Sequence, residues 1–213
     1  MLKVWGRRNS FNVQKIMWLI GELDIPHEHI PAGGDFGGLT TPEFLAMNPH
    51  GRVPVIKDDG AVVWESHAIL RYLAAQFGNG TFWSGDAAKR ALYEEWMDWM
   101  QTSLQPTFLN DVFLAFYRTP ENERNWSVIN RGIEQSAMHF RFIDRWLDGR
   151  SFMLGESLSL ADIAVGTALF RYFTLEIERP SLPNVEGWYE RLRGRAPYRQ
   201  HVMVPFDDLY GKR

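Results

Sequence analysis

Residues 48–70, NPHGRVPVIKDDGAVVWESHAIL, constrain the fold more than any other stretch of the chain. Val53 and Pro54 open an apolar strand, where a proline removes a backbone donor and often marks a cis bond in a tight turn. Glu65 and Ser66 follow at the start of a helical pattern, and a serine there makes a small polar site at a positive helix end. The segment therefore predicts a site for an extended, peptide-like ligand with a free amine and free carboxylates.

The composition excludes several classes of function. Of the 213 residues, 45% are hydrophobic and 23% charged, which is ordinary for a globular protein, and the net charge of −3 does not favour a nucleic-acid partner. No apolar run has the length of a membrane span. Cysteine is absent, so any thiol chemistry needs a thiol that arrives with the ligand. We expect a cytoplasmic protein with no nucleic-acid or membrane partner.

A histidine pair, His27 and His29, has the spacing of two metal ligands on one strand face. No further ligand is spaced to join them, and the chain has no thiolates. We therefore expect two partly exposed strand histidines and no metal site.

The first third of the chain alternates strand and helix patterns. Hydrophobic periodicity and turn residues predict strands at 2–6, 27–30, 55–57 and 62–64, and helices at 12–23 and 66–77. The glycine-rich loop at 32–38 lacks the lysine and the strand-to-helix setting of a phosphate-binding loop.

The remainder of the chain is predicted to be helical. Helices are expected from Leu92 past a kink at Pro106, and at 129–147, 163–173 and 184–193. Ser159 and Asp162 form a capping-box pattern, which assigns Asp162 a structural role. The predicted organisation is an α/β domain over 1–77, a linker over 78–85 and an all-α domain over 86–213.

Three separated motifs resemble those of the glutathione transferase family, and the resemblance covers essentially the whole chain. They are PEFL at 42–45 with NP at 48–49 and GRVPVI at 51–56, ES at 65–66, and SLADIA at 159–164. The resemblance implies a thioredoxin-like N-terminal domain followed by an all-α helical-bundle C-terminal domain.

The same resemblance assigns a glutathione-binding role to one set of residues. Pro54 would be cis, and Val53 would offer its backbone N–H and C=O to the cysteinyl part of glutathione. Glu65 and Ser66 would hold the γ-glutamyl amine and carboxylate, and Arg52 would meet a ligand carboxylate. The alternatives remain that Ser66 is only a helix cap, Pro54 only a strand edge and Arg52 a solvated side chain. His67 is expected on the helix surface.

The segment after the first strand resembles the Ser-x-Asn-x-x-Lys pattern of bacterial serine-type members, near the theta, phi and nu classes. By this match Ser10 is the first choice for contact with the glutathione sulfur and Asn12 the second. A free thiol has a pKa of about 8.5, so hydrogen bonds to the sulfur and a helix N-terminus would favour the thiolate. Helix capping is the alternative role for both residues. No tyrosine precedes Tyr72, which excludes a tyrosine-type mechanism at this place.

The second substrate is less defined. The resemblance places it beside aromatic side chains, for which the candidates are Phe11, Phe108, Phe113, Phe116 and Tyr117. Aromatic residues at helical spacing also serve as core. Many relatives carry His or Lys before the PEFL run, where this chain has Leu39, Thr40 and Thr41, so the glycine end of glutathione is left to Arg52 or to the glycine-rich loop.

The resemblance implies a detoxifying glutathione transferase that adds glutathione thiolate to an electrophilic, largely apolar small molecule. Glutathione would be a co-substrate, with no other cofactor, and the protein would be a homodimer. Two alternatives are a glutathione-dependent disulfide reductase and a non-catalytic ligand-binding member of the family.

Overall fold

The computed structural model describes residues 1–78 and 80–212, which form two compact units. Unit 1 comprises Met1–Arg90 and Ala196–Val204, and unit 2 comprises Ala91–Arg195 and Pro205–Arg213. Asn79 of the predicted linker 78–85 and Arg213 of the predicted domain 86–213 lie outside the described residues, and those boundaries stay predictions. Within the described residues, no helix is long and apolar enough to cross a membrane.

Unit 1 contains a four-stranded mixed sheet in the order β2-β1-β3-β4. The strands are β1 (Leu2–Trp5), β2 (His27–Ile30), β3 (Val55–Asp58) and β4 (Ala61–Trp64). β1 and β2 are parallel, whereas β3 is antiparallel to both β1 and β4. Val4 pairs with Ile56, and both side chains are fully buried, so the middle of the sheet has an apolar face.

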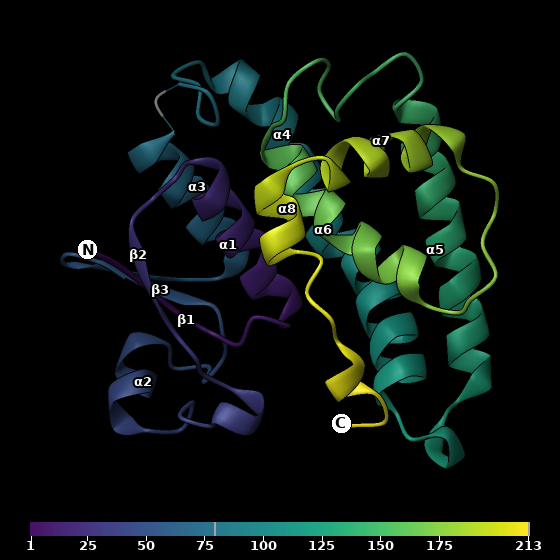
Figure 1. Ribbon diagram of the computed structural model, residues 1–213, viewed down its shortest axis with the longest axis horizontal. Helices are drawn as coiled ribbons and strands as arrows, with labels where there is room; N and C mark the ends of the chain where they lie inside the picture. Colours follow the sequence, from purple (N-terminus) through teal and green to yellow (C-terminus); the bar gives the residue numbers. More distant parts are fainter. Residues whose placement is uncertain (79, 213) are drawn as a thin grey trace. The chain divides into compact units, whose positions relative to one another are not determined.

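Helices cover both faces of this sheet. Figure 1 shows α1 (Phe11–Glu22) and α3 (Ser66–Phe77) on one side, and α2 (Pro42–Met47) with η1 (Gly34–Phe36) on the other. α8 (Ala196–His201) packs on α1, where the rings of Trp18 and Tyr198 meet edge to face at 4.7 Å. The turn from β1 into α1 requires Gly6, because a Cβ there would lie 2.3 Å from Val13 Cγ2 and φ is +155°.

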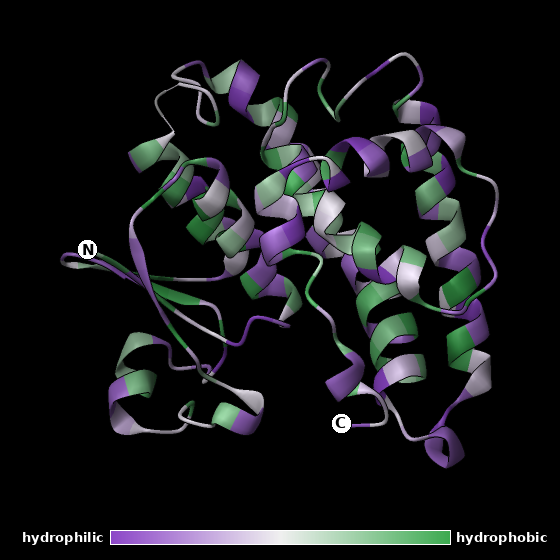
Figure 2. Ribbon diagram, viewed as in Figure 1, coloured by the Kyte–Doolittle hydropathy of each residue, from purple (hydrophilic) through white to green (hydrophobic). Residues whose placement is uncertain are grey.

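Unit 2 is helical. Its elements are α4 (Ala87–Trp99, which begins in unit 1), η2 (Met100–Arg118), η3 (Glu121–Glu123), α5 (Trp126–Trp146), α6 (Leu160–Thr174), α7 (Pro183–Arg193) and η4 (Asp207–Leu209). α6 is buried along nearly its whole length, whereas hydrophobic and hydrophilic residues alternate along α5 (Figure 2). Gly132 of α5 permits close approach to η2, since a Cβ there would lie 2.7 Å from Asp111 Cβ.

The predicted elements are largely confirmed. The helix over 66–77 has the predicted ends, and the helix predicted over 12–23 begins one residue earlier, at Phe11. The helix runs past Pro106 as predicted, because α4 continues into η2, a π-helix that contains the proline. The short helix α8 was not predicted, because six residues carry too little periodicity and its burial depends on α1.

The capping box of α6 is present as predicted. The Asp162 carboxylate is fully buried and accepts hydrogen bonds from the Ser159 N–H at 2.9 Å, the Ser159 hydroxyl at 2.8 Å, the Met153 N–H at 2.8 Å and Trp188 Nε1 at 3.1 Å. Burial raises the pKa of Asp162 to about 6, against the opposing effect of these donors. The Asp162 carboxylate thus connects the start of α6, the preceding loop and α7 through hydrogen bonds.

Asp162→Ala is expected to lower the free energy of unfolding by about 3–5 kcal/mol, because it leaves the Met153 and Trp188 donors buried without an acceptor. Ser159→Ala, which removes only the hydroxyl, is expected to cost about 1 kcal/mol. Urea unfolding of both variants at neutral pH measures the difference, and equal losses would contradict this account.

Candidate functional site

The loop before β3 is held by the buried side chain of Asn48. Its Nδ2 donates to the Arg52 carbonyl at 2.8 Å, and its Oδ1 accepts from the His50 N–H at 3.0 Å. The Gly51 N–H donates to the Asn48 carbonyl at 3.0 Å. One amide side chain therefore fixes the backbone that leads into Val53.

The Val53–Pro54 peptide bond is cis, which confirms the expectation. Pro54 is buried, whereas Val53 is half-exposed just before β3 begins. Among the described residues, no hydrogen bond engages the Val53 N–H or C=O. These groups therefore remain available to pair with an extended ligand, as an added strand does.

Glu65 is the N-cap residue of α3 and has an unusual backbone. Its φ of 70° and ψ of 119° are rare for a residue with a Cβ, and its side chain makes no capping hydrogen bond. The exposed carboxylate is therefore held beside the N-terminus of α3. Ser66, the first residue of that helix, is buried.

Ser66 and Asn12 meet although they are far apart in sequence. The Ser66 hydroxyl donates to Asn12 Oδ1 at 3.4 Å, which connects the first turns of α3 and α1. Ser10 is the N-cap residue of α1, yet its side chain makes no capping hydrogen bond. The two segments predicted to act on different parts of one ligand are thus adjacent, at two positive helix ends.

His67 differs from its prediction. It was expected on the helix surface, but it is buried, and its Nε2 lies 3.1 Å from the Lys15 ammonium nitrogen. The ring is buried because α1 packs against α3 at this level.

The expected site for the glycine end of glutathione has two cationic neighbours. Arg52 is exposed and forms no ion pair among the described residues. Arg7 packs along the glycine-rich loop, since a Cβ at Gly34 would lie 3.2 Å from Arg7 Cδ. The loop backbone at Gly34 has a φ of 59°, which suits glycine.

The aromatic candidates fall into two groups. Phe11 is buried in unit 1, with the Lys15 ammonium 4.8 Å from its ring centroid. In unit 2, Phe108 and Phe113 are buried in the core. Phe116 and Tyr117 are half-exposed, so among the four candidates of unit 2 these two have the most accessible side-chain surface.

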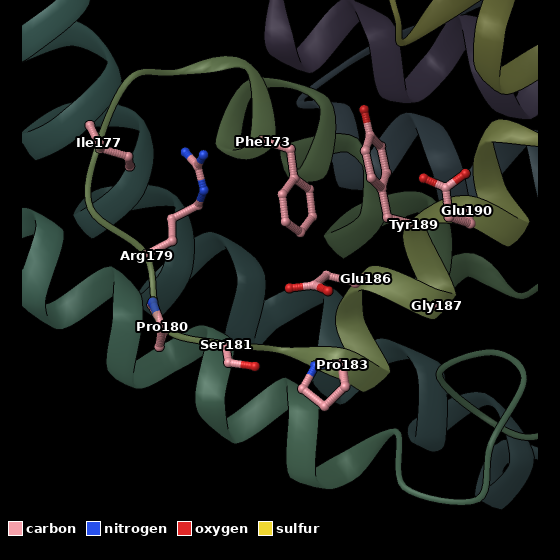
Figure 3. A pocket seen from close by; sticks show the side chains of 10 residues that line it. All are labelled: Phe173, Ile177, Arg179, Pro180, Ser181, Pro183, Glu186, Gly187, Tyr189 and Glu190. Carbon is pink, nitrogen blue, oxygen red and sulfur yellow. The ribbon is translucent and has the colours of Figure 1, made fainter.

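A separate pocket of about 850 Å³ lies in unit 2, between the loop after α6 and the first turns of α7 (Figure 3). Two of its three charged residues already stabilise helix ends, and the third, Glu190, pairs with Arg193. Arg179 Nη1 donates to the Tyr172 and Leu175 carbonyls at the end of α6, and Glu186 accepts from the Leu182 N–H at the start of α7. The pocket contains none of the predicted site residues.

The strand histidines form hydrogen bonds with the backbone. His27 Nδ1 lies 2.9 Å from the Ile25 carbonyl oxygen, and His29 Nε2 lies 2.7 Å from the Gly6 carbonyl oxygen.

Burial lowers the pKa of His201 on α8 to about 4, with the nearby His27, Arg8 and His29 acting in the same direction. Within the described chain, no group of three or more His, Cys, Asp or Glu residues is placed to hold a metal ion.

Comparisons with known proteins identify the family of this chain. The "Glutathione S-transferase, N-terminal domain" family matches residues 1–75, and the "Glutathione S-transferase, C-terminal domain" family matches residues 104–196. Glutathione S-transferase GstB of Escherichia coli K12 is 36% identical over 207 residues, which cover 96% of this chain and 99% of that protein. The chain belongs to the glutathione S-transferase family.

Solved structures give the same family. The theta class glutathione S-transferase of the citrus canker pathogen Xanthomonas axonopodis pv. citri, with glutathione bound, superposes with a TM-score of 0.90. It is 39% identical, and the match covers 96% of this chain and 98% of that one. A delta-class glutathione transferase of Nilaparvata lugens, 24% identical with 94% and 92% coverage, has a TM-score of 0.83 and supports the fold alone. The chain thus has the thioredoxin-like and helical domains of the glutathione S-transferase fold.

Three residues of this glutathione S-transferase were not given a role from sequence. Asn48 organises the loop before the cis peptide bond, and Lys15 forms a buried pair with His67. Pro49 and Gly51, which follow Asn48, are turn residues and were the sequence signal for its role in the loop. Lys15 is the lysine of the Ser-x-Asn-x-x-Lys pattern, but its pairing with His67 had no local signal, because the two residues are 52 positions apart.

Glu65→Gly is expected to be more stable than Glu65→Ala by about 1 kcal/mol, because glycine adopts a positive φ without a steric penalty. Both variants lack the carboxylate, so the comparison isolates the backbone. Thermal and urea unfolding measure the difference. An alanine variant as stable as the glycine variant would show that the φ of Glu65 carries no strain.

Proposed function

We propose that this protein binds glutathione in unit 1 and adds its thiolate to an electrophilic, largely apolar small molecule. Val53 pairs through its backbone with the cysteinyl part of the ligand. Glu65 binds the γ-glutamyl ammonium, and Ser66 binds its carboxylate at the N-terminus of α3. Arg52 attracts the carboxylate of the glycine end. Glutathione bound in the Xanthomonas relative supports the choice of ligand.

The contact between Ser66 and Asn12 is the observation on which this proposal rests. It joins the segment proposed to bind the γ-glutamyl end to the segment proposed to act on the sulfur. A ligand that reaches from Ser66 past Val53 in an extended form places its middle residue, the cysteinyl group, near the first turn of α1. The free backbone groups of Val53 are consistent with that path.

The Ser10 hydroxyl donates a hydrogen bond to the glutathione sulfur, and Asn12 stabilises the same thiolate through its side-chain amide N–H. Ser10 lies at the N-terminus of α1, and its hydroxyl is not used to cap that helix. A hydrogen bond together with a positive helix end favours the thiolate over the thiol. Within unit 1, Phe11 follows Ser10 directly and is the aromatic candidate there. Within unit 2, Phe116 and Tyr117 are the candidates with accessible side-chain surface, since Phe108 and Phe113 belong to the core.

Ser10→Ala is expected to reduce kcat/KM for conjugation by about 10–100-fold, because one donor to the developing anion is lost. Asn12→Ala is expected to have a smaller effect. Ultraviolet thiolate absorbance of the glutathione complex and steady-state conjugation rates measure both, with Ser127→Ala on exposed α5 surface as the control. If neither variant weakens the thiolate signal, the assignment of the sulfur contacts is wrong.

Titration calorimetry and a disulfide assay distinguish the alternative functions. Glutathione is expected to bind at micromolar to low millimolar concentration, and absence of binding would contradict both enzymatic functions. Disulfide reduction without conjugation would favour the reductase. Binding with neither activity would favour a ligand-binding protein.

We also propose that the protein is a homodimer that associates through an aromatic patch on α4 and α5. Leu92, Met138 and Phe142 are 51%, 59% and 40% exposed, and Phe142 lies within 5.6 Å of the Trp96 and Trp99 rings. Large exposed apolar side chains that cluster in this way mark interaction surfaces. A second copy presents the same patch and offers a matching partner. A cytoplasmic location stays a prediction.

Phe142→Glu is expected to shift the protein from dimer to monomer, because it places a charge in the apolar patch. Sedimentation velocity over a range of concentrations measures the association. Leu114→Glu, which alters an exposed leucine of η2, is the control and is expected to remain dimeric. A wild-type protein that is monomeric throughout would contradict the proposal.

A further inference from the structure

Lys15 is a buried lysine in the helix that carries the proposed sulfur contacts. Its relative exposure is 0%, which is unusual because lysine is almost never fully buried without a partner. The ammonium nitrogen lies 3.1 Å from His67 Nε2 and 4.8 Å from the centroid of the Phe11 ring. Burial lowers the pKa of Lys15 from 10.5 to about 7, whereas the Glu65 carboxylate acts to raise it. Both protonation states are therefore accessible near neutral pH.

The pair of Lys15 and His67 lies directly behind the contact of Asn12 with Ser66. Lys15 follows Asn12 by three residues on α1, and residues so spaced lie on the same side of a helix. His67 follows Ser66 at the start of α3. The two cross-helix contacts thus connect the same two helix turns, one at the ligand site and one behind it.

The charged groups around Lys15 come from few elements. From α3, His67 faces the ammonium, and the N-cap residue Glu65 is the one carboxylate that shifts its pKa among the described residues. From α8, the titratable side chain His201 lies against Gly21, two turns away along α1, and its electrostatic neighbours are His27, His29 and Arg8. When Lys15 is an ammonium it donates to His67 Nε2, so the ring is then a neutral acceptor.

We propose that the buried Lys15, hydrogen-bonded to His67, is a proton-binding site that couples the affinity for glutathione to pH. The proposal rests on the proposed function and assigns a regulator to that same site. Glutathione has one ammonium and two carboxylates, so it adds net negative charge beside Lys15. The bound ligand therefore favours the ammonium form of Lys15, and by linkage the protein takes up protons when it binds.

The sign of the pH dependence follows from this linkage. Below neutral pH, Lys15 is already an ammonium and the ligand binds at full strength. As the pH rises through about 7, binding must bring a proton with it, so the affinity falls. Lys15 is therefore a positioning residue. It acts on the ligand through its charge and through the turn that contains Glu65 and Ser66, and it does not touch the sulfur.

Calorimetry with S-methylglutathione tests the coupling, since this ligand has no thiol to titrate. Titrations at pH 7 in two buffers of different ionisation enthalpy are expected to show an uptake of about 0.4 proton by the wild type and none by Lys15→Met. The wild-type affinity is expected to fall about fivefold to tenfold from pH 6 to pH 8, whereas that of Lys15→Met stays level. Lys57→Met, which alters an exposed lysine of β3, is the control and retains the uptake.

A second variant, at His67, distinguishes the titration of Lys15 from the hydrogen bond that Lys15 forms with residue 67. In His67→Gln the amide oxygen still accepts from Lys15 but does not titrate, so proton uptake is expected to persist. Lys15→Met is expected to melt at or above the wild-type temperature, because an apolar chain replaces a buried amine. If Lys15→Met does not fold, loss of uptake in His67→Gln overturns the proposal.

The outcomes distinguish a failure of the pH coupling from a failure of the proposed glutathione-binding function. A wild type that binds neither glutathione nor S-methylglutathione at millimolar concentration overturns both. Binding with the same proton uptake in the wild type and in Lys15→Met overturns the coupling alone. Binding with no uptake by the wild type also overturns the coupling and leaves the glutathione site in place.

Discussion

The packing of α1 against α3 is the contact on which the rest of unit 1 depends. Both helices bury apolar residues over one face of the sheet, including Ile16 on α1 and Leu70 on α3. Because successive helix residues are rotated by about 100°, a change of register by one residue would separate every polar pair between the two helices. The apolar interface thus sets the geometry of the polar site.

The parts of this arrangement that are local in sequence could be predicted from sequence. The strands and helices follow from hydrophobic period and turn residues, and the Glu65–Ser66 pair follows from a family motif. The burial of His67 could not be predicted, because it depends on Lys15, which is distant in the chain. The φ of Glu65 was equally hidden, since glutamate gives no signal for a positive φ. The docking of α8 depends on aromatic contacts that only the folded chain provides.

Buried polar groups have different roles in the two units. In unit 2, Asp162 accepts four hydrogen bonds, so its burial is compensated and its role is structural. In unit 1, the buried Lys15 and the backbone of Glu65 are both locally unfavourable, and both lie beside the same helix N-terminus. A binding site typically gathers several locally unfavourable residues, because the geometry that binds the ligand matters more there than the stability of the fold.

The return of residues 196–204 to unit 1 has a consequence for how the chain folds as it is synthesised. Gln14 donates to the Val202 carbonyl, 188 residues later in the chain, and Trp18 packs on Tyr198, so part of the surface of α1 is completed only by a segment made much later. The sheet and its first helices emerge early from the ribosome, but α1 remains partly uncovered until residues 196–204 have been made. The surface of α1 around Trp18 is therefore exposed during that interval, and unit 1 reaches its final packing only after most of unit 2 has been synthesised.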